Sequence, residues 1–128
     1  MKQQHRYKAI TEEGGREDML NKFFQAEIRR RDENALMEIL QSENGRWFLM
    51  RLLDATKVNA PCFTGNSQTF YNEGRREVGL QILNNIAALG MQGIRYKQQA
   101  ETEYIEMQQK AREIAADYAD NKEGADRL

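Results

Sequence analysis

Carboxylates in the C-terminal part of the sequence are side chains that could do chemistry by their type alone. Paired carboxylates can act as general acid and base or bind a metal ion together. The neighbours here are lysine, glutamine and arginine, and no Glu-x-x-His pattern of the kind found in di-iron bundles accompanies them. A solvated helix face therefore explains these residues better than a catalytic or metal site. They are Glu101, Glu103, Glu106 and Glu113.

Nucleophilic catalysis lacks a base in this sequence. The only histidine is His5, expected to be solvated, and the only cysteine is Cys62. A Ser–His–Asp or Cys–His arrangement needs a histidine beside the nucleophile. A disulfide framework or a cysteine-based zinc site needs more than one cysteine. The motifs of phosphate loops and zinc proteases are missing as well. We therefore expect a protein that is not an enzyme and uses neither cofactor nor metal.

Two arginine clusters could contact anions. The guanidinium groups of Arg75 and Arg76 could clamp a phosphate or an acidic partner, although Glu73 and Glu77 beside them favour salt bridges within the chain. Three arginines at 29–31 could displace counterions from DNA, but they also suit the C-terminus of a helix. The net charge of −1 gives no overall attraction to DNA or to an anionic membrane.

The composition fits one domain with a modest core. The sequence has 128 residues, of which 40% are hydrophobic, below the usual share of roughly 45–50%. Parts of the chain are therefore expected to depend on partners for burial. No apolar run approaches the roughly 20 residues of a membrane span, and polar residues follow the first methionine where a signal peptide would be apolar. We expect the protein to be made and folded in the cytoplasm.

Apolar residues at helical spacing predict an all-α protein. The Gly14–Gly15 pair should end any helix begun before it, which leaves residues 1–16 as an extended or frayed polar arm. Asp32, Ser42 and Ser67 are expected to cap helices. Helices are predicted over 18–31, 33–41, 43–56 and from 68 onward, with a loop over 57–66 that holds the only proline.

The last part of the sequence predicts a long C-terminal helix with a hinge at Gly90–Gly93. Apolar positions are sparse after Ile94, so this helix should pack on a neighbouring subunit or project as an arm. We divide the chain into a polar arm (1–16), a helical bundle (17–90), an extended helix for assembly (91–120) and a disordered tail (121–128). The predicted core residues are Trp47, Phe48, Leu52, Phe70, Val78 and Ile82.

Tyrosines recur along the predicted assembly helix. Tyrosine stacks on nucleic-acid bases, but it is also favoured at protein interfaces because its ring is apolar and its tip polar. We favour the interface. The residues predicted to meet partners are Arg75, Arg76, Tyr104, Ile105, Ala111 and Tyr118.

The central block, Gly45–Leu83, carries a family resemblance in three stretches. They are Gly-Arg-Trp-Phe-Leu-Met-Arg-Leu-Leu from Gly45, Phe-Thr-Gly-Asn-Ser from Phe63, and Phe-Tyr-Asn-Glu-Gly-Arg-Arg-Glu-Val-Gly-Leu from Phe70. These three stretches resemble the sequences of a small family of structural proteins of short-tailed bacteriophages, encoded near portal and head genes. The family brings no catalytic residues with it. The resemblance implies a virion or assembly setting for a protein made in the host cytoplasm.

Three hypotheses follow from the resemblance together with the helical pattern. The first is a virion structural protein at or near the portal vertex, either a head–tail connector or an internal core protein. It would dock on the portal, on other phage structural proteins or on copies of itself, with weak contact to packaged DNA. The second is a scaffold-like or packaging accessory protein that is absent from the mature virion. The third is a small DNA-binding protein.

Overall fold

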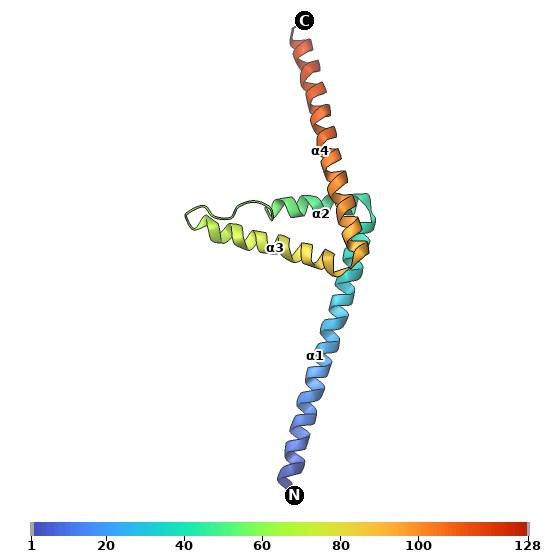
Figure 1. The fold of residues 1–128 in the computed structure, drawn as a ribbon, viewed down its shortest axis with the longest axis vertical. Helices are drawn as coiled ribbons and strands as arrows, with labels where there is room; N and C mark the ends of the chain where they lie inside the picture. Colours follow the sequence, from blue (N-terminus) through green and yellow to red (C-terminus); the bar gives the residue numbers. More distant parts are fainter. Residues whose placement is uncertain (1, 128) are drawn as a thin grey trace. The chain divides into compact units, whose positions relative to one another are not determined.

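The computed structural model describes residues 2–127, and the surroundings of side chains from residue 14 onward. Over this range the protein is all-α, as predicted, and contains no strand. The four helices are α1 (Lys2–Gln41), α2 (Glu43–Ala55), α3 (Gln68–Ala88) and α4 (Met91–Asp126) (Figure 1). The chain forms two compact units, residues 1–35 and 36–128, and each is considered by itself. The expected side-chain environment of His5 and the state of Leu128 lie outside the described part.

The first unit consists of α1 up to residue 35. The helix runs through Gly14, Gly15 and Asp32, so the predicted helix stop, the predicted cap at Asp32 and the extended arm over 1–16 are wrong. Each glycine costs a helix about 1 kcal/mol relative to alanine, and this cost is spread over a long segment without proline. Propagation on both sides of the glycine pair outweighs it.

The second unit begins with the last turns of α1 and a tight junction to α2. Ser42 is extended (φ −105°), and its Oγ accepts a hydrogen bond from the backbone N–H of Gly45 at 2.9 Å. The predicted cap is therefore confirmed. A Cβ on Gly45 would collide with the carbonyl oxygen of Ile39 and with Ser42 Oγ, which explains the glycine at this position.

The start of α3 is capped by a different residue from the one predicted. Ser67 is already helical (φ −59°) and its side chain makes no capping bond. Instead, Asn66 Oδ1 accepts hydrogen bonds from the backbone N–H of Gln68 at 2.9 Å and from the hydroxyl of Thr64 at 2.8 Å. The capping role lies one residue earlier because an asparagine side chain can hold the same turn.

The core of the second unit lies where the end of α1, α2, the second half of α3 and the first turns of α4 meet. Leu40, Leu49, Leu53 and Ile86 form its buried centre. Ile82, a predicted core residue, packs against this cluster. The helix α2 crosses α4 and forms an antiparallel hairpin with α3 (Figure 1).

The other five predicted core residues are 39–77% exposed, which corrects the prediction. The inward face of α2 carries Arg46, Leu49 and Leu53, and that of α3 carries Gly79, Ile82 and Ile86. Both sets follow the three- and four-residue spacing of one helix face, and the five exposed residues lie off these two lines. The exposed residues are Trp47, Phe48, Leu52, Phe70 and Val78.

The join between α3 and α4 matches the predicted hinge, and the end of α4 does not match its prediction. Leu89 ends α3, and Gly90 adopts a positive φ of 81°, which glycine tolerates best. The helix α4 then continues to Asp126, beyond the predicted end near Asp120 and through most of the predicted disordered tail. Alanine, lysine and glutamate in these last turns are good helix formers. The functional division of the chain stays a prediction.

Candidate assembly surfaces

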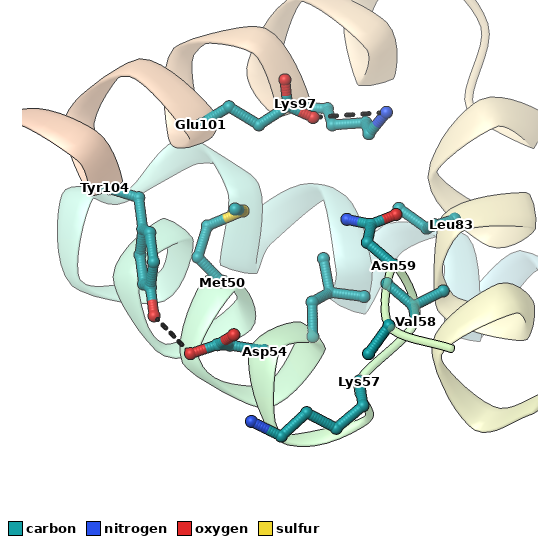
Figure 2. Close-up of a pocket in the computed structure, with 11 residues that line it drawn as sticks. Met50, Asp54, Lys57, Val58, Asn59, Leu83, Lys97, Glu101 and Tyr104 are labelled. Carbon is teal, nitrogen blue, oxygen red and sulfur yellow. Dashed lines mark hydrogen bonds and ion pairs between the residues drawn. The ribbon is translucent and has the colours of Figure 1, made fainter. Parts of the chain in front are cut away.

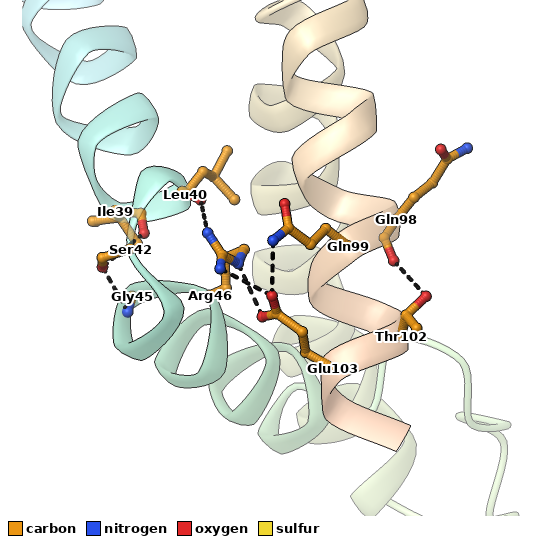
Figure 3. A network of polar contacts seen from close by, with 9 residues as sticks. All are labelled: Ile39, Leu40, Ser42, Gly45, Arg46, Gln98, Gln99, Thr102 and Glu103. Carbon is orange, nitrogen blue, oxygen red and sulfur yellow. Dashed lines mark hydrogen bonds and ion pairs between the residues drawn. The ribbon is translucent and has the colours of Figure 1, made fainter. Parts of the chain in front are cut away.

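A buried arginine joins three helices of the second unit. Arg46 Nε and Nη2 donate to the two carboxylate oxygens of Glu103 on α4, each at 2.9 Å. Its Nη1 donates to the carbonyl oxygen of Leu40, at the end of α1, also at 2.9 Å (Figure 3). The side chain of Arg46 is 8% exposed and that of Glu103 is 29% exposed. Such a fork fixes orientation as well as distance.

The hydrogen bonds at this site keep both groups charged. The bond from Arg46 lowers the pKa of Glu103, burial works in the opposite direction, and a bond from Gln99 Nε2 lowers it further. The same bond with Glu103 raises the pKa of Arg46. Glu103 is therefore a structural partner rather than part of a solvated face, which corrects the sequence interpretation at this residue. No sequence spacing signals the pair, because 57 positions separate its members.

The remaining C-terminal glutamates show no shared site. Glu101 pairs with Lys97 one turn away at 3.3 Å, and Glu106 and Glu113 are exposed. Within the described residues, no group of three or more histidine, cysteine, aspartate or glutamate side chains could hold a metal ion.

A tyrosine predicted to meet a partner packs within the chain. Tyr104 is buried between α4 and α2, with its ring centroid 5.1 Å from that of Trp47. Its hydroxyl donates to Asp54 Oδ2 at 3.2 Å. Tyr104 is thus engaged inside the second unit, which corrects its prediction as a free contact residue.

Beyond Tyr104, the same face of α4 continues without cover. We call Met107, Ala111, Ile114 and Tyr118 the α4 stripe, all of them exposed. They follow Ala100 and Tyr104 in alternating steps of three and four residues, so they lie on one line along the helix. Ala111 and Tyr118, both predicted contact residues, belong to this stripe. Ile105, also predicted, is exposed but lies off this line.

The first unit carries a second exposed apolar surface. We call Met19, Leu20, Phe23, Phe24 and Ile28 the α1 stripe. These five side chains are 46–65% exposed. They extend over fewer than three turns and form a broad apolar face on a helix whose remaining residues are mostly charged or polar.

The predicted arginine pair is bonded within the α2–α3 hairpin. Arg76 Nε donates to the carbonyl oxygen of Val58 at 3.1 Å. Arg75 Nη2 donates to Asn72 Oδ1 at 3.1 Å, and its guanidinium lies 5.1 Å from the ring centre of Tyr71. The favoured intrachain bonds exist, but with a carbonyl, an amide and a ring instead of the neighbouring glutamates. A role of this pair toward partners stays a prediction.

The crevice between α2, α3 and α4 has a volume of about 630 Å³. Figure 2 shows two polar contacts among the residues that line it: an ion pair of Lys97 with Glu101, and a hydrogen bond from Tyr104 to Asp54. Its floor is formed by apolar side chains such as Met50 and Leu83.

One comparison with known proteins finds a family whose match begins at the same residue as the second unit. The family described as Bbp19-like phage protein matches residues 36–101, which begins where the second unit begins and includes α2, α3 and the first turns of α4. No curated protein and no solved structure matches the chain. None of the helices in the described part is long and apolar enough to span a membrane. Because the match covers more than half of the sequence and includes the central block that resembles phage structural proteins, the chain belongs to the Bbp19-like phage protein family.

Proposed function

We propose that this phage protein is a non-enzymatic structural component of the virion, located at or near the portal vertex. It acts as a head–tail connector or an internal core protein, by docking on the portal, on other phage structural proteins or on copies of itself. The observation that carries the proposal is the pair of exposed apolar surfaces, the α1 stripe and the α4 stripe.

Both stripes lie on helices that are otherwise rich in charged and polar residues. Single exposed apolar side chains are ordinary on a protein surface, whereas contiguous ones mark interaction sites. Burying one large apolar side chain contributes about 1.5–3 kcal/mol. A partner that covers either stripe therefore buries apolar side chains that are exposed to solvent in the single chain. An amphipathic helix laid into a groove of another protein is the expected mode of docking.

Docking on proteins explains the polar groups better than catalysis or DNA binding does. The best-formed polar contacts, Arg46 with Glu103 and Tyr104 with Asp54, tie helices of one chain together. Arg75 and Arg76 are bonded within the hairpin, and the net charge of −1 adds no attraction to DNA. Packaged DNA is therefore at most a weak contact in this proposal.

Quantitative mass spectrometry of purified phage tests the proposal. We expect the protein in mature particles, in a fixed ratio to the portal protein. If it stays with particles after DNA release, it is a connector, and if it leaves with the DNA, it is an internal protein. Presence in precursor heads but not in mature particles would contradict the proposal and identify an assembly helper.

A further inference from the structure

We infer that the α4 stripe is the seam of a homodimer. In this arrangement residues 107–118 of a second copy lie antiparallel on the stripe, and Tyr118 of each copy sits beside Trp47 and Met107 of the other. The inference concerns the isolated chain, so it holds or fails independently of a place in the virion.

The α4 stripe continues a line of side chains that are packed inside the chain. Ala100 and Tyr104 are buried against α2, and the stripe continues their line through Met107, Ala111, Ile114 and Tyr118. Steps of four and three residues are the spacing of a coiled-coil seam. Figure 1 shows α4 extending well past its crossing with α2. The seam therefore begins inside one chain and ends without a partner.

Two copies of the stripe fit each other sterically when the second helix runs in the opposite direction. If Ala111 lies opposite Ile114 of the second copy, a small side chain faces a large one on both sides of the two-fold axis. The next layer then places Met107 opposite Tyr118 of the second copy. A small side chain facing a large one fills the two central layers, Ala111 with Ile114, without a void or a collision.

Charged residues beside the stripe also form opposite-charge pairs in this arrangement. In the same register, Lys110 of one copy flanks the seam beside Asp117 of the other, and the two-fold axis produces this pair twice. A parallel arrangement would instead place Ala111 opposite Ala111 and Tyr118 opposite Tyr118, and would bring Asp117 beside Lys122. The antiparallel arrangement thus combines the better steric fit with a distinct charge pairing.

A hollow at the start of the exposed stripe offers room for a side chain of the second copy. A pocket of about 250 Å³ lies between α2 and α4, with Trp47, Ala100, Tyr104 and Met107 among its lining residues. The antiparallel register brings Tyr118 of the second copy to Met107, at this pocket. A tyrosine seated beside a tryptophan is a common centre of binding energy at interfaces. This seating also accounts for the exposure of Trp47, 39% in the single chain.

Sedimentation equilibrium of the full-length protein tests the inference, with Kd of the dimer as the measured quantity. We expect Lys110→Glu and Asp117→Lys each to weaken the dimer about tenfold or more, because each reversal creates two like-charge contacts. The double variant Lys110→Glu/Asp117→Lys should return Kd to within about threefold of the original value, since both pairs are restored with opposite sign. Tyr118→Ser should abolish the dimer.

Ile105→Ser is the matched control, because Ile105 is about as exposed as Tyr118 but lies off the seam. It should leave Kd unchanged. All substituted side chains are exposed, and circular dichroism should show the original helix content in every variant. A monomer at high micromolar concentration would overturn the inference. So would rescue by Asp117→Lys/Lys122→Asp instead, which identifies a parallel pair, or self-association that ignores the charge reversals, which places the contact elsewhere.

Discussion

Replacing Arg46 with methionine will lower the free energy of unfolding by about 3 kcal/mol. Removing one member of a buried ion pair leaves the other without its partner and costs roughly 3–5 kcal/mol. The lower end applies here because Glu103 is 29% exposed and retains its bond from Gln99. The substitution also leaves the carbonyl oxygen of Leu40 without its donor. Urea unfolding at fixed protein concentration measures the difference.

Two variants isolate the cause of this loss. Arg51→Met is the matched control: Arg51 lies on the same helix, is 61% exposed and faces Asp54 at 4.0 Å, so its loss should cost less than about 1 kcal/mol. The double variant Arg46→Met/Glu103→Met should recover part of the stability, because it leaves no unpaired charge. Equal losses for the Arg46 and Arg51 variants would show that the buried pair does not hold the helices together.

The same pair fixes the direction of a pH effect. The pKa of Glu103 is lower in the folded protein than in the unfolded chain, where it has the usual glutamate value of 4.5, so the contribution of Glu103 to stability is complete above that value. As the pH falls through that value and then through the lowered folded pKa, the contribution is lost. The stability gap between the original protein and Glu103→Gln should therefore narrow on acidification, and a constant gap would contradict the assignment.

Gly79→Ala will destabilise the protein by about 1–3 kcal/mol, although alanine is the better helix former. A Cβ at this position would collide with Thr56 Oγ1 and lie 2.9 Å from the Cβ of Val58. Thr56 cannot easily move, because it is buried and its hydroxyl donates to the carbonyl oxygen of Leu53 at 2.6 Å. Overpacking of this kind exceeds the gain in helix propensity.

Gly74→Ala is the control for that substitution. Gly74 lies in the same helix, and nothing stands within 4 Å of its would-be Cβ. The alanine should therefore stabilise the protein by up to about 1 kcal/mol through helix propensity alone. Thermal unfolding of both variants should give shifts of opposite sign. Stabilisation by both would mean that α3 and the end of α2 do not approach each other as closely as described.

Helix content was predictable from this sequence, but the buried face of each helix was not. In α2, apolar residues occupy nearly every side, so periodicity alone cannot choose between Leu49 and Phe48. The choice depends on Arg46, whose partner Glu103 lies on another helix and leaves no local signal. On α3, the inward face includes Gly79. The sequence does not reveal why glycine is needed there, because the reason is the close contact with Thr56.

Part of the α4 stripe could be identified from the sequence alone. Ala111 and Tyr118 were identified as contact residues because the final helix has too few apolar residues to bury itself. Ile114 and Met107 lie between and before them on the same line, and counting heptad steps from Ala100 would have found both. The helix ends that the sequence predicted at the Gly14–Gly15 pair and before Gly124 were also wrong, since these glycines lower helix stability without stopping the helix.

We propose that the α4 stripe serves assembly and contributes little to the fold of the single chain. The most direct measurement compares phage carrying Ile114→Ser with phage carrying the off-seam control Ile105→Ser, by the copy number of the protein in purified particles. Both purified proteins should keep the helix content of the original, because both side chains are exposed. We expect Ile114→Ser to deplete the protein from particles and Ile105→Ser to leave its copy number unchanged. Equal and undiminished copy numbers for both variants would contradict it.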